Sequence, residues 1–121
     1  MPKILIVDDS NMLRDMVKHA LNEGGYPDVV EAVDGVDGLS KAKSTQFDLI
    51  ISDINMPNMT GVEFLGYIKS SEMFKKIPFV ILSGEDSTSQ KIDLLERGAS
   101  DYISKPFNPM ELKVRLKKLV E

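Results

Sequence analysis

The sequence contains no cysteine and a single histidine, His19. Without cysteine, the chain has no disulfide scaffold, no thiol nucleophile and no cysteine-ligated zinc. With one histidine, a metal site built from several histidines is excluded as well. These two scarcities remove thiol chemistry and most zinc sites together.

Long apolar runs are also missing. No run approaches the roughly 20 residues of a membrane-spanning helix, and Met1 to Ile4 leads straight into a strand-like segment with no room for a signal peptide. We therefore expect a cytoplasmic protein that does not insert into a membrane. The net charge of −4 offers no broad positive field, so we expect no direct binding of nucleic acid.

With 121 residues, of which 42% are hydrophobic and 28% charged, the chain resembles one globular domain, which we expect to span residues 1–121. Short continuous apolar runs alternate with stripes of helical period. The runs predict strands at residues 4–7, 29–32, 47–52, 79–82 and 102–103. Capping residues predict a helix after each strand, with caps at Ser10, Asp34, Thr60, Ser87 and Asn108.

Helical periodicity also predicts which side chains face the core. In the first helix the apolar stripe consists of Met12, Leu13, Met16, Val17, Ala20 and Leu21. In the later helices it consists of Leu39 and Ala42, then Val62, Leu65 and Ile68, then Ile92 and Leu95, and finally Leu112, Leu116 and Leu119. The fourth helix has the weakest pattern.

Strand and helix alternate five times, which implies an α/β fold with a parallel sheet and helices on both faces. Because the crossover connections are almost always right-handed, the carboxyl ends of the strands open on the same edge. Ligands and chemistry gather at that edge in open α/β sheets. The polar residues that follow the strands there are Asp8, Asp9, Asp53, Ser83 and Lys105.

Three carboxylates at one edge repel one another strongly. At an effective dielectric of about 20, each pair ~4 Å apart costs on the order of 4 kcal/mol. Mg²⁺ relieves this repulsion, because it binds few protein carboxylates and keeps several waters for a phosphoryl ligand. The metal and Lys105 together balance the three negative charges. Asp53 is then able to act as a nucleophile toward phosphorus.

Each of these residues also has a simpler interpretation. Asp8, Asp9 and Ser10 are typical of a helix cap, and an aspartate before a proline-containing turn, such as Asp53, is typical of an Asx turn. Ser83 before glycine is ordinary turn chemistry, and Lys105 before proline is typical of a surface loop. It is the occurrence of all of them at matching strand ends that favours a common site.

The motifs resemble those of response-regulator receiver domains of two-component signalling. The resemblance extends from Lys3 to the last helix and depends on four motifs: Asp8-Asp9, Asp53 with Asn55-Met56-Pro57, Ser83-Gly84, and Lys105-Pro106-Phe107. It implies a flavodoxin-like (βα)5 fold, doubly wound around a five-stranded parallel sheet in the order 2-1-3-4-5.

The resemblance also implies a role for each site residue. Asp53 would accept phosphate from the phosphohistidine of a histidine kinase. Asp9 and Asp53 would bind Mg²⁺ through their side chains, Asn55 through its backbone carbonyl, and Asp8 through water. Lys105, in a cis bond to Pro106, would pair with the phosphoryl oxygens. Ser83, which stands where many relatives have threonine, would donate a hydrogen bond to one of them.

Further roles are implied for signalling. Ser83 and Tyr102 would act as the switch, with the Tyr102 ring moving inward after phosphorylation. Asn55 and Glu85 would tune dephosphorylation. The chain would catalyse only its own phosphorylation and dephosphorylation, so we do not expect an enzyme with an external substrate.

An unidentified protein target would bind the face formed by the fourth helix (residues 87–98), the fifth strand (102–103) and the last helix (from residue 108). The last helix has a basic side made of Lys113, Arg115, Lys117 and Lys118. That side suits an acidic partner, although such charges are more often only a solvated helix face.

Two other functions compete with a stand-alone receiver. A small phosphatase of the haloacid-dehalogenase type also uses an aspartate nucleophile, but it places an acid two residues later, where this chain has Asn55, and it carries a cap domain. A receiver cut from a longer regulator with a DNA-binding output is equally compatible with the sequence. A role in chemotaxis follows only by analogy with small regulators of the family.

Overall fold

Strands and helices alternate strictly along the chain. The structure is a computed structural model, and it describes residues 1–84 and 87–120. Within these residues the order is β1 (Ile4–Val7), α1 (Asn11–Glu23), β2 (Val29–Ala32), α2 (Gly35–Ser44), β3 (Leu49–Ser52), α3 (Gly61–Ser70), β4 (Phe79–Ser83), α4 (Thr88–Glu96), β5 (Asp101–Ser104) and α5 (Pro109–Val120). Each predicted strand and helix is therefore present.

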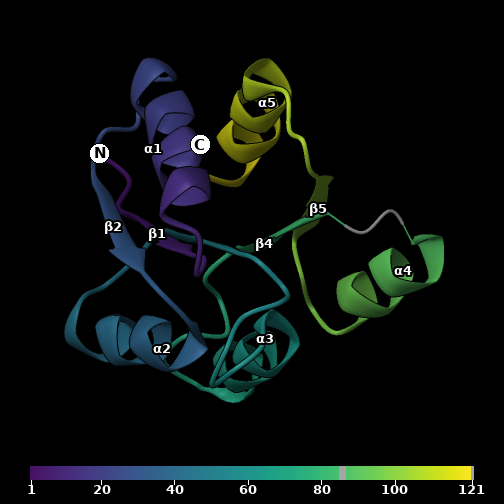
Figure 1. Cartoon of the computed structure of the whole chain (residues 1–121). Coiled ribbons are helices and arrows are strands. Elements are labelled where there is room, and N and C mark those ends of the chain that lie inside the picture. Colours follow the sequence, from purple (N-terminus) through teal and green to yellow (C-terminus); the bar gives the residue numbers. More distant parts are fainter. Residues whose placement is uncertain (85–86, 121) are drawn as a thin grey trace.

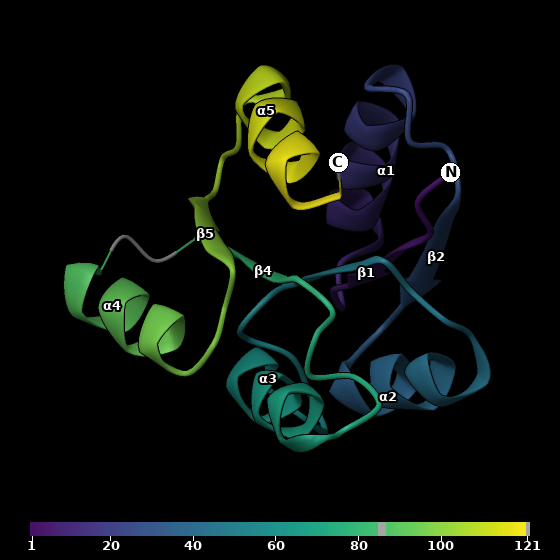
Figure 2. The same ribbon diagram turned by 180° about the vertical axis from the view of Figure 1, so that it is seen from behind.

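The five strands form one parallel sheet in the order β2-β1-β3-β4-β5. Helices α1 and α5 cover one face, and α2, α3 and α4 lie on the other (Figures 1 and 2). The doubly wound, flavodoxin-like arrangement expected from the sequence is confirmed. Every helix of the described chain is too short or too polar to cross a lipid bilayer.

The apolar core has two halves, one on each face of the sheet. Leu5 and Val7 of β1 point into the half under α2, α3 and α4, whereas Ile4 and Ile6 point into the half under α1 and α5. Because both faces of the strand are buried, the strand is a continuous apolar run and does not alternate with polar residues. This burial fixes where β1 ends, and so where the acids begin.

The helix caps form as the sequence predicts. Ser10 Oγ accepts from Leu13 N at 3.2 Å, and Asp34 Oδ1 accepts from Asp37 N at 2.8 Å. Thr60 forms a complete capping box with Glu63 at the start of α3. These caps fix the helix starts, which lie beside the carboxyl ends of the strands.

The structure corrects two predicted core stripes. Met12 and Met16 are 72% and 51% exposed, and the buried face of α1 instead includes Arg14. In α4, Ile92 and Leu95 are 52% and 39% exposed, and Leu94 is the buried residue. In both helices the apolar pattern allowed more than one rotation about the helix axis. In α1 the predicted Val17, Ala20 and Leu21 are buried and only the Met12 and Met16 edge of the stripe faces outward, whereas in α4 the buried residue is the neighbour of the predicted Leu95.

Two glycines of α3 provide a matched stability test. A Cβ on Gly61 would lie 2.0 Å from the backbone oxygen of Asp53, whereas a Cβ on Gly66 would meet nothing within 4 Å. We predict that Gly61→Ala destabilises the fold by about 1–3 kcal/mol, because the backbone that carries Asp53 must shift. Gly66→Ala should stabilise the fold by about 0.5–1 kcal/mol, since alanine loses less backbone entropy in a helix.

Equilibrium unfolding in urea measures both free energies. Equal effects of the two substitutions would contradict the close approach of α3 to the Asp53 carbonyl.

Candidate functional site

The first acid of the site lies directly after β1. Asp8 is 3% exposed, and its backbone N–H donates to the carbonyl of Ala32 on β2 at 3.1 Å. Its carboxylate Oδ1 accepts from Ser10 N at 2.9 Å. Asp8 and Ser10 thus do form a helix-capping turn, as the simpler interpretation had it. In this turn the Asp8 carboxylate still lies near the other acids.

The second acid lies directly after β3, the neighbour of β1 in the sheet. The strands pair with Val7 opposite Ser52, so the residues that follow, Asp8 and Asp53, leave the sheet side by side. Asp53 N donates to the carbonyl of Val7 at 2.9 Å, and the Asp53 carboxylate Oδ1 accepts from Ile54 N at 2.8 Å. The backbone of both acids is therefore fixed by a neighbouring strand, and each carboxylate is held by the N–H of a residue that follows it.

The cation of the site comes from the loop after β5. Lys105 N donates to the carbonyl of Ser83 at 2.7 Å, and the Lys105-Pro106 bond is cis, as predicted. The ammonium Nζ lies 3.2 Å from Asp53 Oδ1 and 3.4 Å from Asp8 Oδ2. One lysine therefore bridges two acids that are 45 residues apart along the chain.

Asp9 completes an acidic cluster with these two residues. Each of Asp8, Asp9 and Asp53 offers a carboxylate oxygen within 4.8 Å of the others. Burial raises the pKa of Asp8 above its ordinary value of 3.8, and the charge of Asp53 raises it further, against the Ser10 N–H and Lys105, which lower it. Burial, more than the charge of Asp53, disfavours the charged form of the Asp8 carboxylate, and Lys105 does not offset it fully. A hard divalent cation with oxygen ligands, of which Mg²⁺ is the common case, fits this donor set.

The remaining candidate residues surround the cluster. Ser83 is fully buried at the end of β4, and Asn55 is exposed in the loop two residues after Asp53. Tyr102 is only 3% exposed, belongs to the core under α4, and donates from its hydroxyl to Gln90 Oε1 at 3.1 Å. Glu85 lies outside the described residues.

The ring of Tyr102 is thus already inward in this structure. The expected inward movement of the Tyr102 ring would therefore end in the packing seen here.

Sequence reasoning missed Arg14. This residue is 7% exposed on α1, and its guanidinium contacts the backbone carbonyl of Asp8. A signal was present, because Arg14 lies three residues before Val17 and seven before Leu21, on the buried face of the helix. The sequence pattern does not reveal Arg14 when only apolar residues are placed on that face.

A parallel sheet in this order, with three acids and a lysine at the carboxyl ends of β1, β3 and β5, defines a flavodoxin-like protein with a candidate cation site. The chain belongs to the response regulator receiver domain family, whose model matches residues 4–117.

The similar proteins include chemotaxis regulators. Chemotaxis protein CheY-3 of Vibrio cholerae is 38% identical over 119 residues, which cover 98% of this chain and 92% of that protein. The structure of the chemotaxis response regulator CheY4 of Vibrio cholerae is 42% identical, with a TM-score of 0.90 and 98% of both chains covered. Proteins of this kind are two-component signalling proteins and not classical enzymes.

A second similar structure is a receiver domain that holds a metal. The receiver domain of the sensor histidine kinase PA1611 from Pseudomonas aeruginosa, with a magnesium ion coordinated in its active site cleft, is 25% identical. Its TM-score is 0.89, and the match covers 98% of this chain and 97% of that one.

The raised pKa of Asp8 leads to a prediction about stability. The folded chain binds more protons at this site than the unfolded chain, so in the absence of divalent cations the contribution of Asp8 to stability falls as pH rises from 3.8 through its higher folded pKa. Asp8→Asn keeps an acceptor for Ser10 N and removes the buried charge. We predict that its melting temperature at pH 7 in EDTA exceeds that of the wild type, and that the gain shrinks as pH falls toward 3.8 and is absent below it.

Differential scanning calorimetry measures this difference. Asp15→Asn, which removes an exposed carboxylate from α1, is the control and should change the melting temperature little. A lower melting temperature of Asp8→Asn at pH 7 would contradict a net cost of burying the Asp8 charge.

Proposed function

We propose that this chain accepts a phosphoryl group on Asp53 from the phosphohistidine of a histidine kinase, in a Mg²⁺-dependent reaction. The observation that supports it best is the Lys105 ammonium, 3.2 Å from Asp53 Oδ1 and 3.4 Å from Asp8 Oδ2, within a cluster of three carboxylates. A carboxylate between a cation and a metal-binding set is arranged for in-line phosphoryl transfer, which needs positioning and charge more than acid-base chemistry.

In this reaction the phosphorus-nitrogen bond of the donor breaks and an acyl phosphate bond to Asp53 forms. Lys105 would neutralise the incoming oxygens and hold the Asp53 carboxylate in position. Ser83, at the end of the neighbouring strand, would donate its hydroxyl to one of those oxygens. Bound Mg²⁺ would supply charge to the transferring group and offset the three carboxylates.

The proposed metal ligands are the side chains of Asp9 and Asp53, the backbone carbonyl of Asn55, and Asp8 through water. The oxygen donor set and the burial that disfavours the charged Asp8 carboxylate support this assignment. The magnesium ion in the active site cleft of the PA1611 receiver domain supports it from a similar structure.

We also propose that α4, β5 and α5 form the output surface for a protein target. The apolar residues Ile92, Leu95, Met110 and Val114 are exposed on its two helices. Arg115 of α5 is paired with Asp101 at 2.9 Å, and this contact raises the pKa of the guanidinium. The pair weakens the case for a purely acidic partner, because one of the basic residues of α5 is already neutralised.

The switch in this proposal is the packing of Ser83 and Tyr102. A phosphoryl group would add charge and acceptors beside Ser83 and Lys105, which favours one of two packings of the β4–α4 connection. Asn55 and Glu85 would tune the loss of phosphate. As in the chemotaxis proteins it resembles, the chain would act as a single cytoplasmic receiver domain over residues 1–121.

The central claim predicts a covalent modification. In the presence of Mg²⁺ and a small acyl phosphate donor such as acetyl phosphate, the intact mass of the protein should rise by one phosphoryl group. Asp53→Asn should show no such rise, whereas Asp48→Asn, at an exposed position before β3, should react like the wild type. Intact-protein mass spectrometry under mild conditions reads the result. Equal modification of the wild type and Asp53→Asn would reject the proposal.

The bridging position of Lys105 predicts opposite effects on two ligands. In the cation-free protein its ammonium contacts the same carboxylates that a metal would use, so Lys105→Gln should bind Mg²⁺ more tightly than the wild type. The same variant should bind beryllofluoride, a phosphoryl analogue, at least about tenfold more weakly, because it lacks a charge-assisted hydrogen bond worth about 1.5–3 kcal/mol.

Titration of both ligands by NMR measures the two affinities. If the affinities for Mg²⁺ and beryllofluoride both fell, Lys105 would serve only to stabilise the fold.

A further inference from the structure

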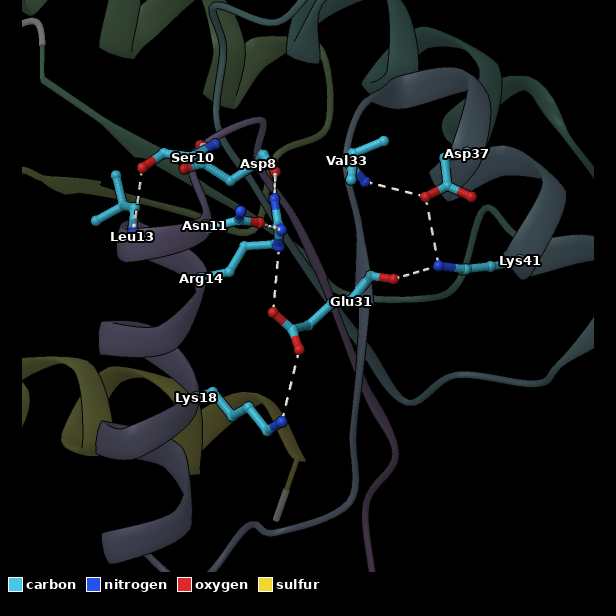
Figure 3. Close-up of polar contacts among 10 residues, drawn as sticks. All are labelled: Asp8, Ser10, Asn11, Leu13, Arg14, Lys18, Glu31, Val33, Asp37 and Lys41. Atoms are coloured by element: carbon cyan, nitrogen blue, oxygen red, sulfur yellow. Dashed lines mark hydrogen bonds and ion pairs between the residues drawn. The ribbon is translucent and has the colours of Figure 1, made fainter.

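A buried arginine lies directly behind the acidic cluster. Arg14 of α1 is only 7% exposed, and arginine is almost never so buried unless its charge is paired. Its guanidinium donates to the backbone carbonyl of Asp8 and to Oδ1 of Asn11, and its Nε lies 3.1 Å from Glu31 Oε1. Figure 3 shows the side chain between these partners, with one end directed to Asp8 and the other to Glu31.

Glu31 of β2 is itself fixed from both neighbouring helices. Its carboxylate contacts Arg14 and lies 3.5 Å from Lys18 Nζ on α1. Its backbone carbonyl accepts from Lys41 of α2, which also reaches Asp37 at 3.3 Å (Figure 3). Because Glu31 supplies the opposite charge, Arg14 acts on Asp8 mainly as a hydrogen-bond donor, and its repulsion of a nearby cation is reduced.

The carbonyl that Arg14 holds belongs to the peptide between Asp8 and Asp9. The peptide unit is planar, so a fixed carbonyl fixes the orientation of the whole unit and the direction in which Asp9 leaves the backbone. The N–H of Asp8 is already bound to Ala32, and its carboxylate to Ser10 N. Asp9 is exposed, so its carboxylate gains little support from packing and depends on this backbone direction.

We propose that Arg14 is a positioning residue for the cation site. By holding the Asp8 carbonyl, it orients the Asp8-Asp9 peptide so that the Asp9 carboxylate converges with those of Asp8 and Asp53. The inference rests on the proposed function, because it concerns how the same acids bind Mg²⁺. Partners that orient metal ligands in this way typically contribute about 10- to 100-fold in metal affinity.

The test compares Arg14→Gln with Lys18→Gln. Both variants remove one positive charge from α1 and one partner from the same Glu31 carboxylate, but Lys18 lies one helical turn farther from Asp8. The probe is MgCl2 alone, titrated while the amide resonances of Asp9 and Asn55 are followed by NMR. We expect Arg14→Gln to weaken Mg²⁺ binding about tenfold, and Lys18→Gln to change it less than about twofold.

Two further measurements separate positioning from stability. The NMR titration reports only folded molecules, so a purely structural role would lower the melting temperature and leave the Mg²⁺ affinity unchanged. Arg14→Lys keeps the charge but lacks the planar fork that reaches several acceptors. We expect it to fold, to shift the Asp9 amide resonance in the metal-free protein, and to weaken Mg²⁺ binding as well.

Several outcomes would overturn the inference. One is an unchanged Mg²⁺ affinity in Arg14→Gln or, should that variant not fold, in Arg14→Lys. Another is an equal loss of Mg²⁺ affinity in Lys18→Gln, which would show that the missing positive charge, and not the orientation of the peptide, weakens binding. If the wild type shows no saturable Mg²⁺ shift, or if Asp53→Asn keeps it, the proposed function fails too. That failure is visible before the Arg14 variants are compared.

Discussion

Like charges held together by a buried sheet are the constraint on which this structure depends. Asp8 and Asp53 follow adjacent strands in register, and the backbone N–H of each is bound within the sheet, to Ala32 and Val7. Neither acid can move away without breaking a strand end whose side chains are buried on both faces. Lys105 contacts both carboxylates, yet the pKa of Asp8 is raised, mainly because its carboxylate is buried and to a smaller extent because of the charge of Asp53. The apolar core thus holds an electrostatically unfavourable site in place.

The loops around the site are tied to one another as well as to the sheet. The side chain of Asn58, in the loop after Asp53, donates to Asp34 Oδ2 at 2.7 Å at the start of α2. Asn58 has a positive φ of 67°, which asparagine tolerates better than most residues. The N–H of Asp37 and the amide of Asn58 lower the pKa of Asp34. The carboxylate therefore stays charged, and it joins two loops at the rim of the acidic cluster.

The sequence predicts most of this architecture for identifiable reasons. The bounds of β1 follow from an apolar run that ends in two acids, and the meeting of Lys105 with Asp53 follows from the fixed hand of the crossovers. The strand order came from the family resemblance, since periodicity says which residues form strands but not which strands pair.

Other features left weaker signals in the sequence. Arg14 was missed because its most informative partner is a backbone carbonyl, and every residue has one. The exposure of Met12 was missed because an apolar side chain on a surface is common, and pattern alone cannot distinguish it from a buried one.

Lys105 also links the site to the face where we propose the output. Its ammonium contacts Asp53, while its backbone N–H donates to the carbonyl of Ser83. Tyr102, three residues earlier on β5, reaches Gln90 of α4 through its hydroxyl. A phosphoryl group on Asp53 would shift the equilibrium between the alternative packings of Tyr102 only as far as it interacts more favourably with one packing than with the other. Because the Tyr102 ring is already buried, the proposed phosphorylation would have to favour the present packing over an outward one, and would not have to create it. The strength of the signal would then be limited by how well the outward packing competes before phosphorylation.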